Sequence, residues 1–162
     1  KNEITELAPD TPMDPDARRE VADLLSNVLA DEYRLFLNTQ GLHWNVEGPM
    51  FYSLHKLTEA QYREFFESID TLAERIRALG LPAPQSFREF AERSILKDLP
   101  DDAELKVRIE QMITDYERAV RRATLVVKLA ETNGDIKTAD LLTERVGIYE
   151  ENAWMLRATI AS

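Results

Sequence analysis

The spacing of the prolines constrains the fold of this chain more than any other feature of its sequence. The 162 residues contain seven prolines, at positions 9, 12, 15, 49, 82, 84 and 100. Proline inside a helix costs about 3 kcal/mol, so helices are expected in the three long stretches that lack it. Four of the five glycines, at positions 41, 48, 80 and 134, lie near the ends of the expected helices.

Apolar residues recur at helical spacing within these stretches, and they predict four long helices. The first begins at Asp14 and Pro15, an N-cap followed by proline at the first helical position, and ends near Leu42. The other three helices are expected near Met50–Leu79, Asp101–Asn133 and Asp135–Ile160.

The link between the second and third helices is much longer than the other two links. It covers Gly80–Pro100, and Phe87, Phe90 and Ile95 predict a short helix inside it. The two short links each join an antiparallel helix pair, whereas the long link can cross the length of a bundle. The sequence therefore predicts an all-α, ferritin-like four-helix bundle over residues 14–162, with a short helix in the crossover and an extended N-terminal segment, residues 1–13.

The charge balance bears on the partners of the chain. There are 30 acidic and 20 basic residues, and the resulting net charge of −10 favours cations over nucleic-acid phosphates. The sequence has no cysteine, which excludes disulfides, thiolate metal sites and a cysteine nucleophile. It also lacks an apolar run of about 18 residues, so no membrane partner is expected. A cytoplasmic location fits the absence of cysteine.

The only two histidines, His43 and His55, flank the predicted turn between the first two helices. Further along the second helix, Asp70 and Glu74 are four residues apart and share a helix face, as do His55 and Glu59. His55 and Asp70 are separated by fifteen residues, or about 22 Å along a helix axis, so they cannot bind one ion within one chain. The chain therefore offers two half-sites at separate places.

A two-fold dimer with antiparallel second helices would join the half-sites across its interface and would contain two such sites. Imidazoles combined with carboxylates suit Fe(II), Mn(II) or Zn(II). Single-chain di-iron bundles use Glu-x-x-His turns, but Gln40 lies three residues before His43, and Tyr52 three before His55. A centre built on such turns is therefore excluded, and the intersubunit arrangement remains.

Each of these signals also has a plainer interpretation. A lone histidine at a helix end is usually a cap or a hydrogen-bonded surface group. Asp70 and Glu74 could form a solvated face of ion pairs with Arg75 and Arg77. The aromatic residues nearby are most simply part of a core or an interface; they are Trp44, Phe51, Phe65 and Phe66. From the residues alone, a metal-free structural bundle stays open as an alternative.

Taken together, these residues resemble the Dps family, the mini-ferritins that oxidise and store iron in starved bacteria. The resemblance covers nearly the whole chain from the first helix onward. The matching residues in the first two helices are His43-Trp44-Asn45-Val46, Gly48-Pro49, Phe51, Leu54-His55 and Asp70-Thr71-Leu72-Ala73-Glu74-Arg75. Those in the last helix are Thr138-Ala139-Asp140-Leu141-Leu142-Thr143 and Trp154-Met155-Leu156-Arg157-Ala158.

The resemblance implies a hollow dodecamer with ferroxidase centres at its two-fold interfaces. The metal ligands at each centre would be His43, His55 and Glu59 of one subunit and Asp70 and Glu74 of the other. Fe(II) would be oxidised there, preferably by hydrogen peroxide, and Fe(III) mineral would be stored in the cavity. Zinc is a candidate substitute for iron at the centre.

The resemblance also assigns roles to residues outside the centre. Trp44 would lie beside it and take up stray oxidising equivalents. Asp135, Asp140 and Glu144 would line three-fold pores that admit iron. The alternative for Asp135 is that its side chain caps the last helix, with the other two carboxylates complementing the helix dipole.

A protein that is associated with the nucleoid and protects DNA by physical binding is the other alternative. Family members that bind DNA often carry a lysine-rich N-terminal tail. Here residues 1–17 contain Lys1 as their one basic residue, together with five acidic residues. The charge balance therefore argues against direct DNA binding.

Overall fold

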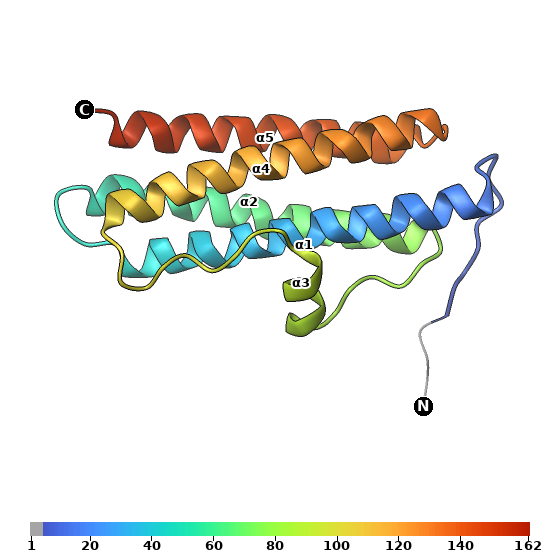
Figure 1. Ribbon diagram of the computed structural model, residues 1–162, viewed down its shortest axis with the longest axis horizontal. Coiled ribbons are helices and arrows are strands. Elements are labelled where there is room, and N and C mark those ends of the chain that lie inside the picture. The colour runs from blue at the N-terminus through green and yellow to red at the C-terminus, as the bar shows by residue number, and fades with distance from the viewer. Residues whose placement is uncertain (1–4) are drawn as a thin grey trace.

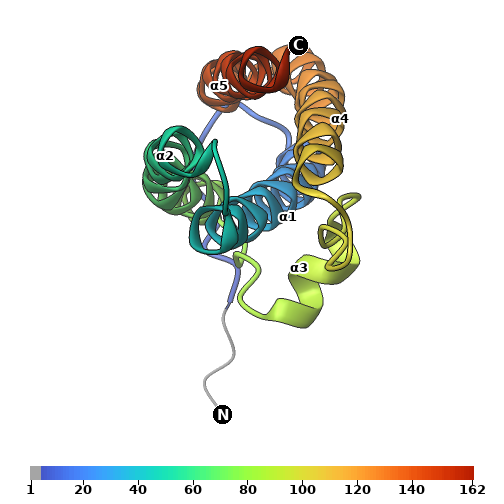
Figure 2. The ribbon, with the colours of Figure 1, turned by 90° about the vertical axis from the view of Figure 1, so that its left-hand side faces the viewer.

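The computed structural model describes residues 5–162, which form five helices and, within that range, no strand. Four of the helices are long and surround a common core, while a short one lies outside it (Figures 1 and 2). The helices are α1 (Pro15–Asn45), α2 (Phe51–Ala78), α3 (Phe87–Arg93), α4 (Leu105–Thr132) and α5 (Ile136–Ile160). The prediction of an all-α four-helix bundle with a short crossover helix is confirmed.

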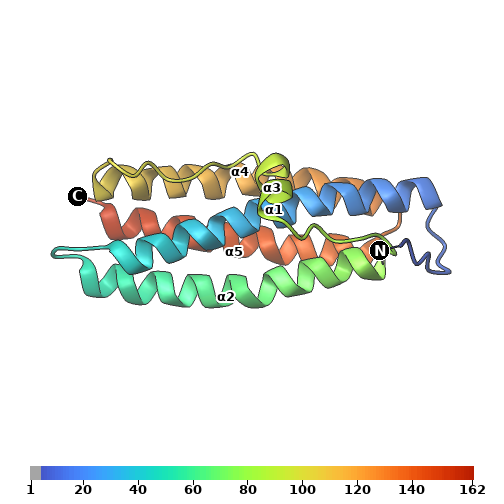
Figure 3. The same cartoon turned by 90° about the horizontal axis from the view of Figure 1, so that it is seen from below.

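The long helices form two antiparallel pairs, α1 with α2 and α4 with α5 (Figure 1). The pairs meet where α1 packs on α4 and α2 approaches α5. The link from α2 to α4 runs back along the length of the bundle, and its helix α3 lies against α1 (Figure 3). This single long crossover leaves α1 and α2 as neighbours with one side free of other helices of the chain.

Two helix ends differ from the sequence prediction. The prediction that the first helix ends near Leu42 was wrong, because α1 includes Gly41 and continues to Asn45. Glycine inside a helix costs only about 1 kcal/mol. Burial of Leu42 and the hydrogen bond from Val46 N–H to the Leu42 carbonyl hold the extra turn together. The start near Asp101 was also wrong, because α4 begins at Leu105.

The predicted N-terminal segment is described from Thr5 onward and contains no helix before Pro15; residues 1–4 lie outside the described range. Leu7 N–H donates to the Gly80 carbonyl at 2.8 Å, and the buried Arg18 donates to Glu6 at 2.6 Å. Gly80 has φ +97°, and a Cβ there would lie 2.7 Å from the Leu7 carbonyl oxygen. The turn after α2 therefore needs glycine both for its backbone and for the approach of this segment.

The core is formed by the inward faces of the four long helices, which carry the apolar stripes that the sequence predicts, together with Leu96 from the link between α3 and α4. Its largest fully buried side chains are Leu25, Leu29, Leu35, Phe65, Leu72, Ile76, Leu96, Ile109, Met112, Tyr116, Leu142 and Tyr149. No helix in residues 5–162 has the length and apolarity to cross a membrane.

Candidate metal centre

His43 and His55 are joined by a reciprocal pair of hydrogen bonds across the α1–α2 turn. His43 Nδ1 lies 2.8 Å from the His55 carbonyl oxygen, and His55 Nδ1 lies 2.8 Å from the His43 carbonyl oxygen. The two rings stack with centroids 3.8 Å apart and planes 14° apart. A carbonyl oxygen only accepts, so each Nδ1 carries a proton, and in the neutral rings both Nε2 atoms keep a free lone pair.

The surroundings of the two imidazoles fix their orientation further. The Tyr62 ring meets the His43 ring edge-on at 5.0 Å, and the Phe51 ring stacks on His55 at 4.9 Å. Thr58 Oγ1 lies 3.5 Å from His43 Nδ1. Such support orients a metal ligand and sets its tautomer. Tyr62 and Thr58 were not predicted, and the only signal for them is their position one or two turns from His55, whereas Phe51 was named only as a core or interface residue.

Glu59 lies one turn beyond His55 on α2 and is half-buried. Its carboxylate pairs with Arg63 at 3.3 Å and with Lys56 at 3.9 Å. The hydrogen bond from Arg63 lowers the pKa of Glu59 below its ordinary value. The carboxylate is therefore charged at neutral pH, and a metal ion would compete with Arg63 for it.

Asp70 and Glu74 lie on α2, and both are exposed. The alternative prediction, that Asp70 and Glu74 form ion pairs with Arg75 and Arg77, is wrong for the described residues. Arg75 instead pairs with Asp135 at 2.7 Å, and within residues 5–162 neither Asp70 nor Glu74 makes an ion pair. Their oxygens are therefore open to a ligand from outside the chain.

The structure does not bring the two half-sites together in one chain. Nowhere in residues 5–162 do three His, Asp, Glu or Cys side chains lie close enough to hold a metal ion. This agrees with the separation of about 22 Å expected from the helix rise.

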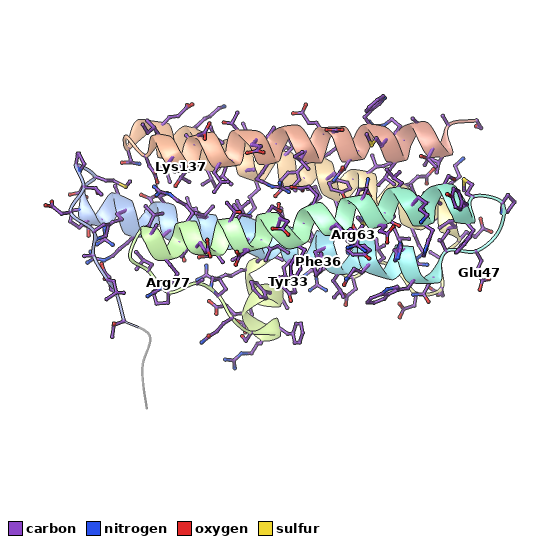
Figure 4. The ribbon with its side chains drawn as sticks, turned by 180° about the vertical axis from the view of Figure 1, so that it is seen from behind. Tyr33, Phe36, Glu47, Arg63, Arg77 and Lys137 are labelled. Atoms are coloured by element: carbon purple, nitrogen blue, oxygen red, sulfur yellow. The ribbon has the colours of Figure 1, made fainter. Side chains whose placement is uncertain are left out.

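An apolar face connects the two half-sites along the outer side of α1 and α2. A groove of about 480 Å³ is lined by Tyr33, Phe36, Phe66, Glu67, Ile69, Asp70 and Ala73. A second groove, of about 340 Å³, shares some of these residues and reaches Tyr62 and Arg63. Figure 4 shows this side of the bundle, with Tyr33, Phe36 and Arg63 in its middle and Glu47 at the α1–α2 turn. The face therefore runs from a side chain that touches His43 to the carboxylate of Asp70.

Of the four aromatic residues predicted to be core or interface, one lies in the core and the other three are exposed, so an interface role for those three stays a prediction. Phe65 is fully buried, whereas Phe66 is 66% exposed and Trp44 63% exposed. Trp44 follows His43 in the last turn of α1, and Phe51, also exposed, lies on the facing end of α2. Exposed aromatic side chains therefore lie at the facing ends of α1 and α2, where the histidines are, and Phe66 lies on the apolar face.

The three carboxylates predicted for an iron pore differ in their surroundings. Asp135 is 2% exposed, accepts a hydrogen bond from Thr138 N–H as the N-cap of α5, and pairs with Arg75. Asp140 and Glu144 are exposed, and Lys137 lies 3.6 Å from Asp140. The capping alternative therefore describes what the Asp135 carboxylate does in this chain, and the pore role stays a prediction.

A second group of polar residues, in the middle of the bundle, was not predicted. Glu32 of α1 and Arg145 of α5 are buried and form an ion pair at 2.7 Å. Each occupies a position in the apolar stripe of its helix, Glu32 after Leu25 and Leu29, and Arg145 between Leu142 and Tyr149. A charged residue in such a stripe was the signal that could have pointed to this pair.

Known proteins resemble this chain over nearly its full length. Residues 22–162 match the ferritin family, a ferritin-like domain. DNA protection during starvation protein 2 of Bacillus anthracis is 34% identical over 143 residues, which cover 86% of this chain and 96% of that protein. A low temperature-induced protein of Nostoc, itself uncharacterized, is 37% identical over 145 residues, covering 88% of this chain and 81% of that protein.

A solved structure extends the match to three dimensions. The crystal structure of a Dps protein from Vibrio cholerae has a TM-score of 0.88 with this chain at 26% identity, covering 99% of this chain and 100% of the other. That protein is described as a member of a broad superfamily of ferritin-like diiron-carboxylate proteins. Agreement this complete in sequence and in fold shows that the chain belongs to the Dps family of ferritin-like proteins.

Proposed function

We propose that this chain oxidises Fe(II) and stores the Fe(III) product, at centres formed between two subunits. The ligands of each centre are His43, His55 and Glu59 of one subunit and Asp70 and Glu74 of the second. The observation that carries the proposal is the reciprocal hydrogen bonding of the two histidines, which occupies both Nδ1 atoms, leaves both Nε2 atoms available and holds the two rings stacked on each other. Kinship with a diiron-carboxylate protein supports iron as the metal.

The apolar face between the half-sites supports the intersubunit arrangement. A two-fold axis across this face would lay two α2 helices antiparallel and bring each pair of histidines against the partner's carboxylates. The same contact would bury Phe66, which is 66% exposed in the single chain. Burying apolar surface contributes about 25 cal/mol per Å², so the face that joins the half-sites would also hold the dimer together.

The ligands suit the oxidation chemically. Neutral imidazoles bind Fe(II), and the carboxylates stabilise the more highly charged Fe(III) product more than they stabilise Fe(II). With hydrogen peroxide as oxidant, two Fe(II) ions each lose one electron, the O–O bond breaks, and two protons complete two water molecules. No hydroxyl radical is released in this reaction. The proposal includes Trp44, which follows His43 in the sequence and is exposed, as the residue that would take up oxidising equivalents that escape the centre.

Storage requires an assembly, and the proposal includes the dodecamer expected of a Dps protein. Twelve chains of net charge −10 carry about −120 in total, which attracts cations at low ionic strength. Asp140 and Glu144 are exposed carboxylates that can line an entry pore, while the Asp135 carboxylate is held by Arg75. The proposal places the protein in the cytoplasm, with no requirement for DNA.

Stopped-flow measurement of Fe(II) oxidation by hydrogen peroxide tests the proposal. The variant that carries His43→Ala and His55→Ala should oxidise iron about 100-fold more slowly than the parent or slower still, because both nitrogen ligands are gone. Phe87→Ala is the matched control, since Phe87 lies on α3 and is 79% exposed. A double variant that oxidises iron as fast as the parent would show that the ligands are assigned wrongly. Crystals soaked in Fe(II) should show anomalous density at a two-fold interface.

A further inference from the structure

The middle of the bundle contains an ion cluster in which one arginine bridges two carboxylates from different helices. Arg145 Nε of α5 donates to Glu32 Oε1 of α1 at 2.7 Å. The two terminal nitrogens of Arg145 donate to the two carboxylate oxygens of Glu64 of α2 at 2.6 and 2.7 Å. The side chains of Glu32 and Arg145 are 0% and 3% exposed, and that of Glu64 is 37% exposed. The cluster is thus enclosed except on the side of Glu64.

Further donors converge on Glu32. Tyr149 donates its hydroxyl to Oε1 at 2.8 Å, and Ser68 donates to Oε2 at 2.6 Å. Burial raises the pKa of Glu32, while the charge of Arg145 opposes this rise. Every partner of this carboxylate is a donor or a cation, which is the environment of a charged carboxylate. With both glutamates charged, the cluster of Glu32, Glu64 and Arg145 has a net charge of −1.

Metal-binding bundles of this general type share one arrangement. A glutamate from each of two helices projects inward, and Glu-x-x-His turns from the other two helices complete the site. This chain keeps an inward glutamate on α1 and one on α2. On the other two helices it has Tyr116 of α4 and Arg145 and Tyr149 of α5 at the same level of the core. A cation that belongs to the chain lies between the two carboxylates.

We propose that Arg145 is a built-in cation that closes a divalent-metal site formed by Glu32 and Glu64. The guanidinium neutralises the two carboxylates in part and occupies the space between them, so divalent metal is kept out of the middle of the bundle. Without Arg145, the buried Glu32 carboxylate lies near the partly exposed Glu64 carboxylate with no compensating charge, which destabilises the fold. A divalent ion would neutralise both charges, and the oxygens of Tyr149 and Ser68 are at hand to complete its ligands.

Cobalt(II) as a probe tests this directly, in a background that carries His43→Ala and His55→Ala to remove the histidine half-site. In EDTA, adding Arg145→Ala should lower the thermal unfolding midpoint by roughly 10 °C or more. Co(II) should restore most of that loss and give a visible absorption band from the bound ion. The background variant with Arg145 intact should show neither the midpoint increase nor the band.

Two further variants separate a metal site from general loosening of the core. Arg145→Lys keeps one positive charge in the cluster, and its unfolding midpoint should not respond to Co(II). Adding Glu64→Gln to Arg145→Ala should abolish the response, because one of the two carboxylates is gone. The proposal is overturned if Co(II) leaves the Arg145→Ala midpoint unchanged, or raises it equally with Glu64→Gln present. If Arg145→Ala yields no soluble protein, soluble yield only from medium with Co(II) supports the proposal, and none in either medium overturns it.

Discussion

The histidine half-site and the Glu32–Glu64–Arg145 cluster both contain side chains of types that bind metals, but their surroundings differ in opposite ways. At the α1–α2 turn, the main chain occupies one nitrogen of each imidazole and leaves the other free. In the middle of the bundle, side chains of the same molecule occupy both oxygens of Glu32. The contrast shows that the choice of partner within the chain, more than the residue type, decides which group is left for a metal.

The largest expected effect comes from mixing two variants that each lack one half-site. This experiment tests whether the histidine half-site needs the carboxylates of a second subunit. A variant with His43→Ala and His55→Ala and a variant with Asp70→Asn and Glu74→Gln should each oxidise Fe(II) about 100-fold more slowly or worse. When the two are mixed and reassembled, half of the dimers are mixed, and each mixed dimer has one intact centre. The mixture should therefore regain about one quarter of the parent rate, because a C₂ dimer contains two centres.

The measurement is the initial rate of Fe(II) oxidation before and after reassembly. Each variant reassembled alone is the control and should stay inactive. A mixture that regains no activity would show that the ligands do not come from two subunits.

The second prediction concerns the Glu32–Glu64–Arg145 cluster and removes one hydrogen-bond donor from Glu32. Tyr149→Phe deletes the hydroxyl that donates to Glu32 at 2.8 Å and leaves the carboxylate with one donor fewer in a fully buried position. We expect a loss of about 1–3 kcal/mol in the free energy of unfolding, measured by chemical denaturation. Tyr52→Phe, at a side chain that is 72% exposed, should change it by much less. Equal stability of Tyr149→Phe and the parent would show that the cluster is not closed as described.

Asp115 of α4 differs from Glu32, because it is a buried carboxylate with a hydrogen-bond partner on only one of its two oxygens. Gln111 donates to Oδ1 at 2.9 Å, and Oδ2 has no partner within the described residues. Burial raises the pKa of Asp115, and the charge of Asp31 adds to this rise, although Gln111 and Arg118 oppose it. The charged form is therefore penalised in the folded state.

Asp115→Asn should accordingly raise the unfolding midpoint at pH 7, where the parent must bury the charge. The sign follows from linkage: a carboxyl with a raised pKa in the folded state destabilises the fold above that pKa. The gain should shrink as the pH falls through the raised pKa and should be absent below about pH 3.8, the ordinary pKa of this group. Glu110→Gln, at an exposed position on α4, should show no such pH dependence.

Much of the fold followed from the sequence, because local rules decide it. Prolines, caps and apolar periodicity placed four long helices and the crossover helix within a few residues. The predicted end of α1 near Leu42 fell short, because the buried His43 and the hydrogen bond from Val46 N–H to the Leu42 carbonyl extend the helix to Asn45. The separation of the half-sites followed from the helix rise alone.

The parts that were missed depend on contacts between distant residues. Arg145 and Glu32 are 113 positions apart, and no local pattern links them. The stacking of His43 on His55 depends on the close approach of α1 and α2 at their turn, which spacing does not specify. The ion pair between Asp135 and Arg75 likewise joins residues far apart in the sequence, so the sequence alone could not choose between the capping role and the pore role of Asp135.

The exchange of hydrogen bonds between His43 and His55 has a consequence for how the two residues contribute to binding. Each ring is oriented by the main chain of the other residue, so the turn and both ligands form one cooperative unit. Truncating one side chain removes the stacking partner of the other ring, but it leaves the main-chain carbonyl that accepts from the remaining Nδ1. The remaining imidazole should therefore keep its tautomer and stay available as one nitrogen ligand. In a double-mutant cycle the coupling between the two alanine substitutions should report the lost stacking, and each single variant should bind metal with an affinity between those of the parent and the double variant.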